Sequence, residues 1–237
     1  MTHRLPPTTV AVTSLTLVWA CASGLLAPAL AASDGVWTQL AADVPARLVG
    51  AAAVYDPVRD RTIVYGGLAD DLWSVSGGEH PTWTRLAPRG PLPRARSGHA
   101  ALYDPLRDRM LVVCGMVDST LDGIHAGTAA TAEVWSLSLT PPETWSLLVA
   151  DVDAHAAEVA RWSAAVVYDA PRDRLVIYGG RTSVEPLCDA WELPLADQVT
   201  WRPLATGGPT PPKSFAMVAA YDSRRERLVS TDRKSVV

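Results

Sequence analysis

The chain has 237 residues, of which 48% are hydrophobic and 19% are charged, and its formal net charge is −4. That length is enough for one domain, and the mildly negative charge gives no reason to expect a surface that binds nucleic acid or another polyanion. Helical periodicity is nearly absent, and Gly and Pro recur at short intervals, so the sequence predicts an all-β protein.

The first 32 residues have the features of a secretory signal peptide. A basic start at 3–4 precedes an apolar stretch over 10–30, and 29–31 is a small-x-small cleavage pattern. We therefore expect a secreted, periplasmic or cell-surface protein with no membrane span after signal removal. Two alternatives stay open, a transmembrane anchor and lipoprotein processing at Cys21.

A phrase of eight residues recurs four times after this leader. It reads VYDPVRDR at 54–61, LYDPLRDR at 102–109, VYDAPRDR at 167–174 and AYDSRRER at 220–227. Its first aspartate (Asp56, Asp104, Asp169 and Asp222) recurs too regularly to be catalytic. An aspartate in this place can accept hydrogen bonds from main-chain N–H groups two residues on, so each phrase predicts a tight turn between two strands.

Three copies of the phrase continue in the same way. An apolar strand follows and ends in two small residues, at 63–67, 111–115 and 175–180. Then come two tryptophans ten residues apart: Trp73 and Trp83, Trp135 and Trp145, Trp191 and Trp201. Their periodic position favours packing between sheets over stacking on a carbohydrate. Each copy therefore predicts four antiparallel strands, which form one blade of a stacked β-sheet array.

The repeats divide residues 33–229 into a partial propeller. We expect blades at 47–86, 94–149 and 161–204, a partial fourth at 213–229, and an outer strand of a ring-closing blade at 36–40. About three complete blades do not close a ring, so we expect an open arc or a truncated fragment. Residues 230–237 replace the expected apolar run and are interpreted as a non-native tail.

The repeat resembles the kelch repeat of galactose-oxidase-type β-propellers. The matching features are the pairs Gly66-Gly67 and Gly179-Gly180, the spaced aromatic pairs and the arginine before the inner strand. The second copy departs from the pattern with Cys114-Gly115, and the fourth stops before its pair. The resemblance implies four-stranded blades around an axis and says little about chemistry.

Four cations precede the inner strands, namely Arg47, Arg96, Arg161 and Lys213. Placed around the mouth of a central channel, they could bind a carboxylate or sulfate group. Kelch domains that bind acidic peptides use arginines in such loops, so the resemblance makes this role relevant. The alternative is that each cation fixes carbonyl groups of its own loop.

The connection at 116–132 is the longest and departs from the repeat period. Loops carry specificity on rigid scaffolds, so this segment is the first candidate for ligand contact. Asp118, Asp122 and His125 lie in it and could touch a ligand or a cation. The alternative is a flexible insertion with no role.

The sequence predicts no catalytic residues, no metal site and no cofactor. Cys114 and Cys188 lack metal-ligand spacing; Cys114 is expected to be a small buried hydrophobe, although a disulfide between the two stays open. His99 is expected to be a hydrogen-bonded structural residue. The kelch-type fold includes copper radical oxidases, but all six tyrosines here occupy repeat positions in strands.

These observations favour a secreted recognition module that binds a protein or a glycan through loops at one face. The alternative is the scaffold part of a secreted carbohydrate-active or copper-radical-oxidase-like enzyme whose catalytic residues lie outside this chain.

Overall fold

The computed structural model describes residues 44–78, 80–121, 124–196 and 198–231. The predicted signal peptide and the predicted outer strand at 36–40 lie outside these residues. Ser230 and Thr231, the first two residues of the predicted tail at 230–237, end the last strand, where they pair with Ala219 and Val218. Among the described residues, no helix is both long enough and apolar enough to cross a membrane.

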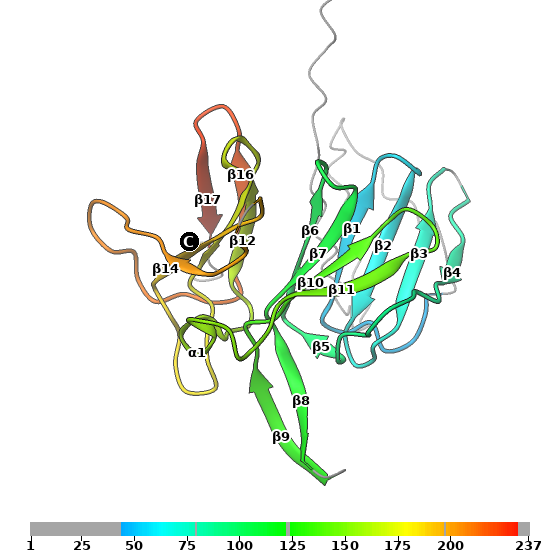
Figure 1. Cartoon of the computed structure of the whole chain (residues 1–237), viewed down its shortest axis with the longest axis horizontal. Coiled ribbons are helices and arrows are strands. Elements are labelled where there is room, and N and C mark those ends of the chain that lie inside the picture. Colours follow the sequence, from blue (N-terminus) through cyan, green and yellow to red (C-terminus); the bar gives the residue numbers. More distant parts are fainter. Residues whose placement is uncertain (1–43, 79, 122–123, 197, 232–237) are drawn as a thin grey trace, which may run out of the picture. The chain divides into compact units, whose positions relative to one another are not determined.

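Three four-stranded antiparallel sheets follow one another along the chain, and none closes on itself (Figure 1). The first blade contains β1 (Ala51–Asp56), β2 (Arg61–Gly66), β3 (Leu72–Ser76) and β4 (Trp83–Arg85). The second contains β6 (Ala100–Asp104), β7 (Arg109–Val113), β10 (Val134–Ser138) and β11 (Thr144–Val149). The third contains β12 (Ala165–Asp169), β13 (Arg174–Tyr178), β14 (Ala190–Pro194) and β15 (Arg202–Pro203). The predicted all-β fold of four-stranded blades is confirmed.

Smaller elements complete the described chain. The fourth blade is the hairpin of β16 (Val218–Asp222) and β17 (Arg227–Thr231). A separate sheet joins β5 (Arg96–Ser97), β8 (Met116–Leu121) and β9 (Ile124–Ala130). The two short helices are α1 (Ala156–Val159) and the 3-10 turn at Ala170–Arg172.

The turn phrase sets the register of every blade. Its first aspartate is the last residue of one strand and pairs with the arginine that begins the next, as in Asp56 with Arg61 and Asp104 with Arg109. Because side chains of a strand alternate between faces, this fixed pairing decides which residues face each neighbouring blade.

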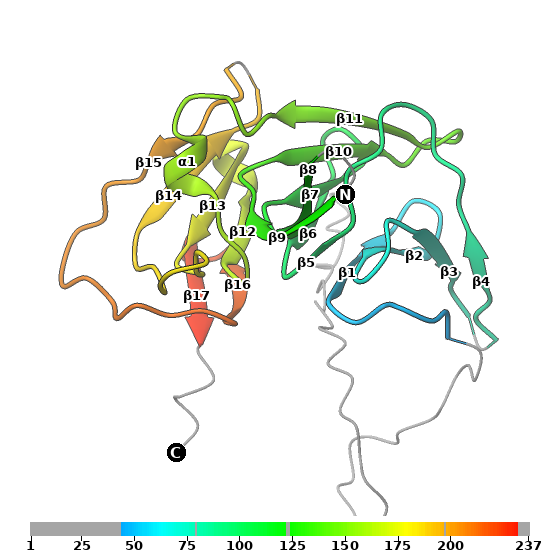
Figure 2. The same cartoon turned by 90° about the horizontal axis from the view of Figure 1, so that it is seen from below.

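The second blade is buried on both faces by its neighbours (Figure 2). Met110 and Val112 of β7 belong to the cluster that includes Ile63 of the first blade. Leu111 and Val113, on the opposite face of β7, belong to the cluster shared with the third blade. This two-sided burial explains why β7 is an uninterrupted apolar run.

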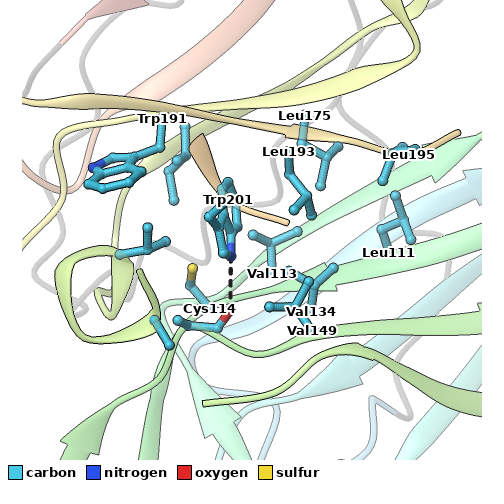
Figure 3. Packing of buried hydrophobic residues seen from close by; sticks show 14 residues of the cluster. Leu111, Val113, Cys114, Val134, Val149, Leu175, Trp191, Leu193, Leu195 and Trp201 are labelled. Atoms are coloured by element: carbon cyan, nitrogen blue, oxygen red, sulfur yellow. Dashed lines mark hydrogen bonds between the residues drawn. The ribbon is translucent and has the colours of Figure 1, made fainter. Parts of the chain in front are cut away.

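Tryptophans fill the space between blades, as the repeat predicts. Trp135, Trp145, Trp191 and Trp201 are all buried, whereas Trp73 and Trp83 of the first blade are half-buried. Trp201 reaches across to the second blade, where its indole Nε1 donates a hydrogen bond of 3.3 Å to the carbonyl of Ala132 (Figure 3). The indoles therefore join consecutive blades by burial and by a cross-blade hydrogen bond.

Candidate functional site

Arg96 and Arg161, two of the four predicted ligand-binding cations, have fully buried side chains. The Arg161 guanidinium donates to both carboxylate oxygens of Asp189, at 2.8 and 3.0 Å, and to the carbonyls of Val159, Gly179 and Glu158. The exposed fraction of its side chain is 0%. The chain itself therefore supplies acceptors around the guanidinium, and ligand binding by Arg161 stays a prediction that its burial does not favour.

Arg96 repeats this arrangement in the second blade. Its Nη2 donates to Glu133 Oε2 at 2.6 Å, its Nη1 to the carbonyl of Cys114 at 3.2 Å, and its Nε to that of Arg94. The side chain has an exposed fraction of 0%. For both arginines the geometry supports the alternative that the guanidinium fixes carbonyls of its own blade.

The acidic partner of each buried arginine also holds a tryptophan. Glu133 accepts from Trp135 Nε1 at 2.9 Å, and Asp189 accepts from Trp191 Nε1 at 2.6 Å. Both acids stand two residues before the first tryptophan of a pair, and Asp71 has the same place in the first blade. This spacing is a signal in the sequence for these contacts, and none of the three acids was among the predicted site residues. Asp71 pairs instead with Arg85.

Arg47 and Lys213 do not occupy the place of the two buried arginines. The carbonyls of Arg96, Arg161 and Ser214 accept from Gly67, Gly115 and Gly180 of the preceding blade at 2.9, 2.9 and 2.8 Å. By this pattern Ser214, not Lys213, corresponds to Arg161. Lys213 is exposed and pairs with Glu185, and Arg47 is exposed and donates to the carbonyl of Leu68 at 3.0 Å. Ligand binding by Arg47 and Lys213 stays a prediction.

Three of the four repeated aspartates hold their turns through main-chain hydrogen bonds, as predicted, whereas the Asp169 carboxylate accepts from the side chains of Arg172 and Arg174. Asp56 Oδ1 accepts from the main-chain N–H groups of Val58 and Arg59 at 3.1 and 3.2 Å. Asp104 accepts likewise from Leu106, and Asp222 from Arg224 and Arg225. These carboxylates stabilise the turns.

The first arginine of the phrase links each blade to the next. Arg59 binds its own Asp56 and also Asp108 of the second blade, at 2.6 Å from Nη2 to Oδ2. Arg107 binds Asp104 and likewise Asp173 of the third blade, at 2.5 Å. Arg172 binds Asp169 and reaches Glu226 of the fourth blade at 2.7 Å. We call this series the arginine ladder.

Two acids of the ladder, Asp108 and Asp173, are held in the ionised form. The hydrogen bonds from Arg59 hold the pKa of Asp108 below its ordinary value, and those from Arg107 do the same for the pKa of Asp173. The Arg59 pKa is raised in turn by its hydrogen bond to Asp108. Because the Arg59–Asp108 and Arg107–Asp173 pairs are only partly exposed, solvent screens them less than a surface pair.

The predicted ligand loop at 116–132 is a β-hairpin. β8 and β9 pair with each other, β5 pairs with β8, and the hairpin extends beyond the blades in Figure 1. Asp118 is exposed; Asp122 lies outside the described residues, and His125 is placed only by its main-chain pairing with Thr120. The predicted loop is thus paired along its main chain, both with itself and with the edge at Arg96–Ser97, and its contact with a ligand stays a prediction.

His99 is buried, as predicted for a structural residue, but it is not hydrogen-bonded. Neither ring nitrogen has a partner within bonding geometry, although the main chains of Tyr65 and Arg96 lie close by. Burial first, and then the positive charge of Arg96, lower the pKa of His99 to about 3. The ring is therefore neutral at physiological pH.

The two cysteines Cys114 and Cys188 are free. Cys114 packs as a small buried hydrophobe, as expected, and burial raises the pKa of its thiol to about 12. A thiol in that state is a poor nucleophile. Among the described residues, no three His, Cys, Asp or Glu side chains converge as metal ligands.

Two hollows large enough for a small ligand lie beside the third blade. The first, about 350 Å³, is lined by Cys188, Trp191, Leu204 and Thr210, among others. The second, about 320 Å³, lies between the third and fourth blades, and its Arg174 and Tyr221 already bind Asp169. Neither hollow is lined by a residue predicted to bind ligand.

No protein-family model matches the chain, and no curated protein matches it either.

Proposed function

We propose that the chain is a secreted recognition module of the kelch-propeller type, which binds a protein or a glycan through the β8–β9 hairpin and its neighbouring loops. The observation that best supports this proposal is that the repeated polar residues are engaged within the chain, whereas the hairpin occurs only once in the described blades. The polar residues that recur with the repeat bind one another and fix turns, carbonyls or the next blade. In the described part of the chain, the hairpin has no counterpart in the other blades.

The position of the hairpin suits a contact surface. It follows directly on the buried strand β7, so its base is fixed by a rigid core. Asp118, Thr128 and Ala129 near its base are exposed. Main-chain pairing along β8 and β9 orders the segment before any ligand arrives, which reduces the entropy lost on binding.

A trimmed hairpin tests the proposal. Replacing 118–128 with Asn-Gly leaves the paired residues Val117 and Ala129 on either side of a two-residue turn. The labelled chain is applied to printed arrays of defined neutral and acidic glycans and of extracellular-type peptides. We expect the intact chain to bind a restricted set of probes and the trimmed chain to lose that binding.

The matched control changes the opposite end of the same blade. Leu106→Ser alters an exposed residue in the turn between β6 and β7, and binding should be retained. Equal binding by the trimmed and intact chains would refute the role of the hairpin. Chemical conversion of a bound glycan by the intact chain would instead favour the alternative, a part of a carbohydrate-active enzyme.

A further inference from the structure

The arginine ladder has two members without a partner in a neighbouring blade. Asp60 corresponds to Asp108 and Asp173, yet among the described residues its carboxylate accepts only from the hydroxyl of Tyr55 in its own blade. Arg225 corresponds to Arg59 and Arg107, yet among those residues it binds only its own Asp222, and 65% of its side chain is exposed. One end of the ladder is thus an exposed acceptor and the other an exposed donor.

Exposed apolar residues lie on the same blades as Asp60 and Arg225. On the fourth blade Ala220 pairs directly with Val229, so both lie on one face; both are exposed, as is Val218 two residues before Ala220. On the first blade Tyr55 is 52% exposed and Ala53 is also exposed.

Residues at the equivalent positions of consecutive blades are packed together at the junctions within the chain. At the junction of the first two blades, Val54 packs in one cluster with Ala101 and Tyr103. At the next junction, Leu102, Val166 and Tyr168 all pack against one buried cluster. Ala220 lies two residues before its turn aspartate, as Val54 and Leu102 do before theirs. On the other side of the junction, Ala53 and Tyr55 correspond to Ala101 and Tyr103. The two open faces therefore carry complementary halves of a junction that the chain makes repeatedly.

We propose that the chain self-associates head to tail, so that the fourth blade of one copy packs on the first blade of a second copy and Arg225 binds the partner's carboxylate at Asp60. Opposite charges at equivalent places select this partner, and the apolar positions supply buried area. Because the two faces differ, the contact is heterologous, and successive copies form a ring or an open chain.

Charge reversal tests this contact. The weight-average mass of the 237-residue chain is measured by sedimentation velocity over a wide range of protein concentration. We expect it to rise with concentration and to fall on adding salt, which screens the ion pair. Arg225→Glu and Asp60→Lys should each weaken association by more than about ten-fold, because like charges then meet.

The most direct test of the contact is to mix the two charge-reversal variants. Each variant repels its own copies, but both junctions between the two variants join opposite charges, so the mixture should associate in a one-to-one ratio, with the variants alternating, although neither variant associates alone. A misfolded variant could not be rescued in this way. Arg224→Glu, the same charge change one residue earlier and also exposed, should leave association intact.

Three results would overturn the proposal. They are a monomer at every concentration, an unchanged association of Arg225→Glu, and a failure of the mixed variants to associate with each other. Loss of association in Arg224→Glu to the same extent would also overturn it, because net charge and not the Arg225 contact would then be responsible.

Discussion

At the scale of single residues, ionic side chains in this protein join one part of the chain to another. Arg161 contacts one carboxylate and three carbonyls, and Arg107 binds two carboxylates from consecutive blades. An arginine fork suits such use because several fixed N–H groups meet planar acceptors. The exposed fraction of an arginine side chain is therefore a better guide to ligand contact than the presence of an arginine at that position.

His99 makes stability depend on pH. The unfolded chain takes up a proton at this histidine below a pKa of about 6.5, whereas the folded protein does so only near pH 3. A lowered folded-state pKa means that the unfolded state binds more protons as the pH falls. The free energy of unfolding should therefore decrease below about pH 6.5, by up to about 1.4 kcal/mol per pH unit.

The His99→Leu variant isolates this contribution. Between about pH 6.5 and 4.5, above the range where carboxylates such as Asp108 and Asp173 become protonated, its unfolding free energy should change less steeply than that of the parent. Urea unfolding at several pH values measures the slope. The control His80→Gln changes an exposed histidine and should keep the parent's slope. Equal slopes in His99→Leu and the parent would contradict the assignment.

At the scale of elements, blades are joined through the small residues that end their second strands. Gly180 has φ +85°, and a Cβ atom there would lie 2.8 Å from the Cβ of Ala164 and 2.9 Å from the carbonyl of Trp162. Its N–H donates to Ser214 of the next blade. The close approach, and not only the left-handed backbone, requires glycine at this position.

Gly180→Ala and Gly208→Ala separate these two requirements. Gly208 has nearly the same φ, +84°, but nothing lies within 4 Å of its added Cβ. We expect Gly208→Ala to lower the unfolding free energy by about 1 kcal/mol, and Gly180→Ala to lower it by about 3 kcal/mol or more. Chemical denaturation compares the two. Equal losses would show that backbone strain alone explains the position.

Elements that recur were predictable from the sequence, and those that occur once were not. The turn phrase and apolar runs specify strands because residue type and spacing repeat in each blade. The hairpin at 116–130 lacks an apolar alternation, so its strands depend on pairing with β5, which no local pattern reveals. The burial of Arg96 likewise depends on Glu133, which lies 37 residues later.

At the scale of the whole molecule, the order of the repeats is also the order of contact. Each described blade packs on the next through one apolar cluster or ion pair of the same kind. The sequence predicts this order because identical units with two apolar faces bury them by stacking on their neighbours. The identity of the ligand was not predictable from the repeats, because the repeated residues make contacts between and within blades.

The arginine ladder is the central claim of this account, and a double-mutant cycle between Arg107 and Asp173 tests it most directly. Asp173 has φ +46°, a conformation that asparagine also adopts readily, so Asp173→Asn removes charge with little backbone strain. Arg107→Gln removes the partner. The ladder predicts that unfolding free energies of the single and double variants reveal a coupling of about 1 to 2 kcal/mol, whereas additivity within about 0.3 kcal/mol would contradict it.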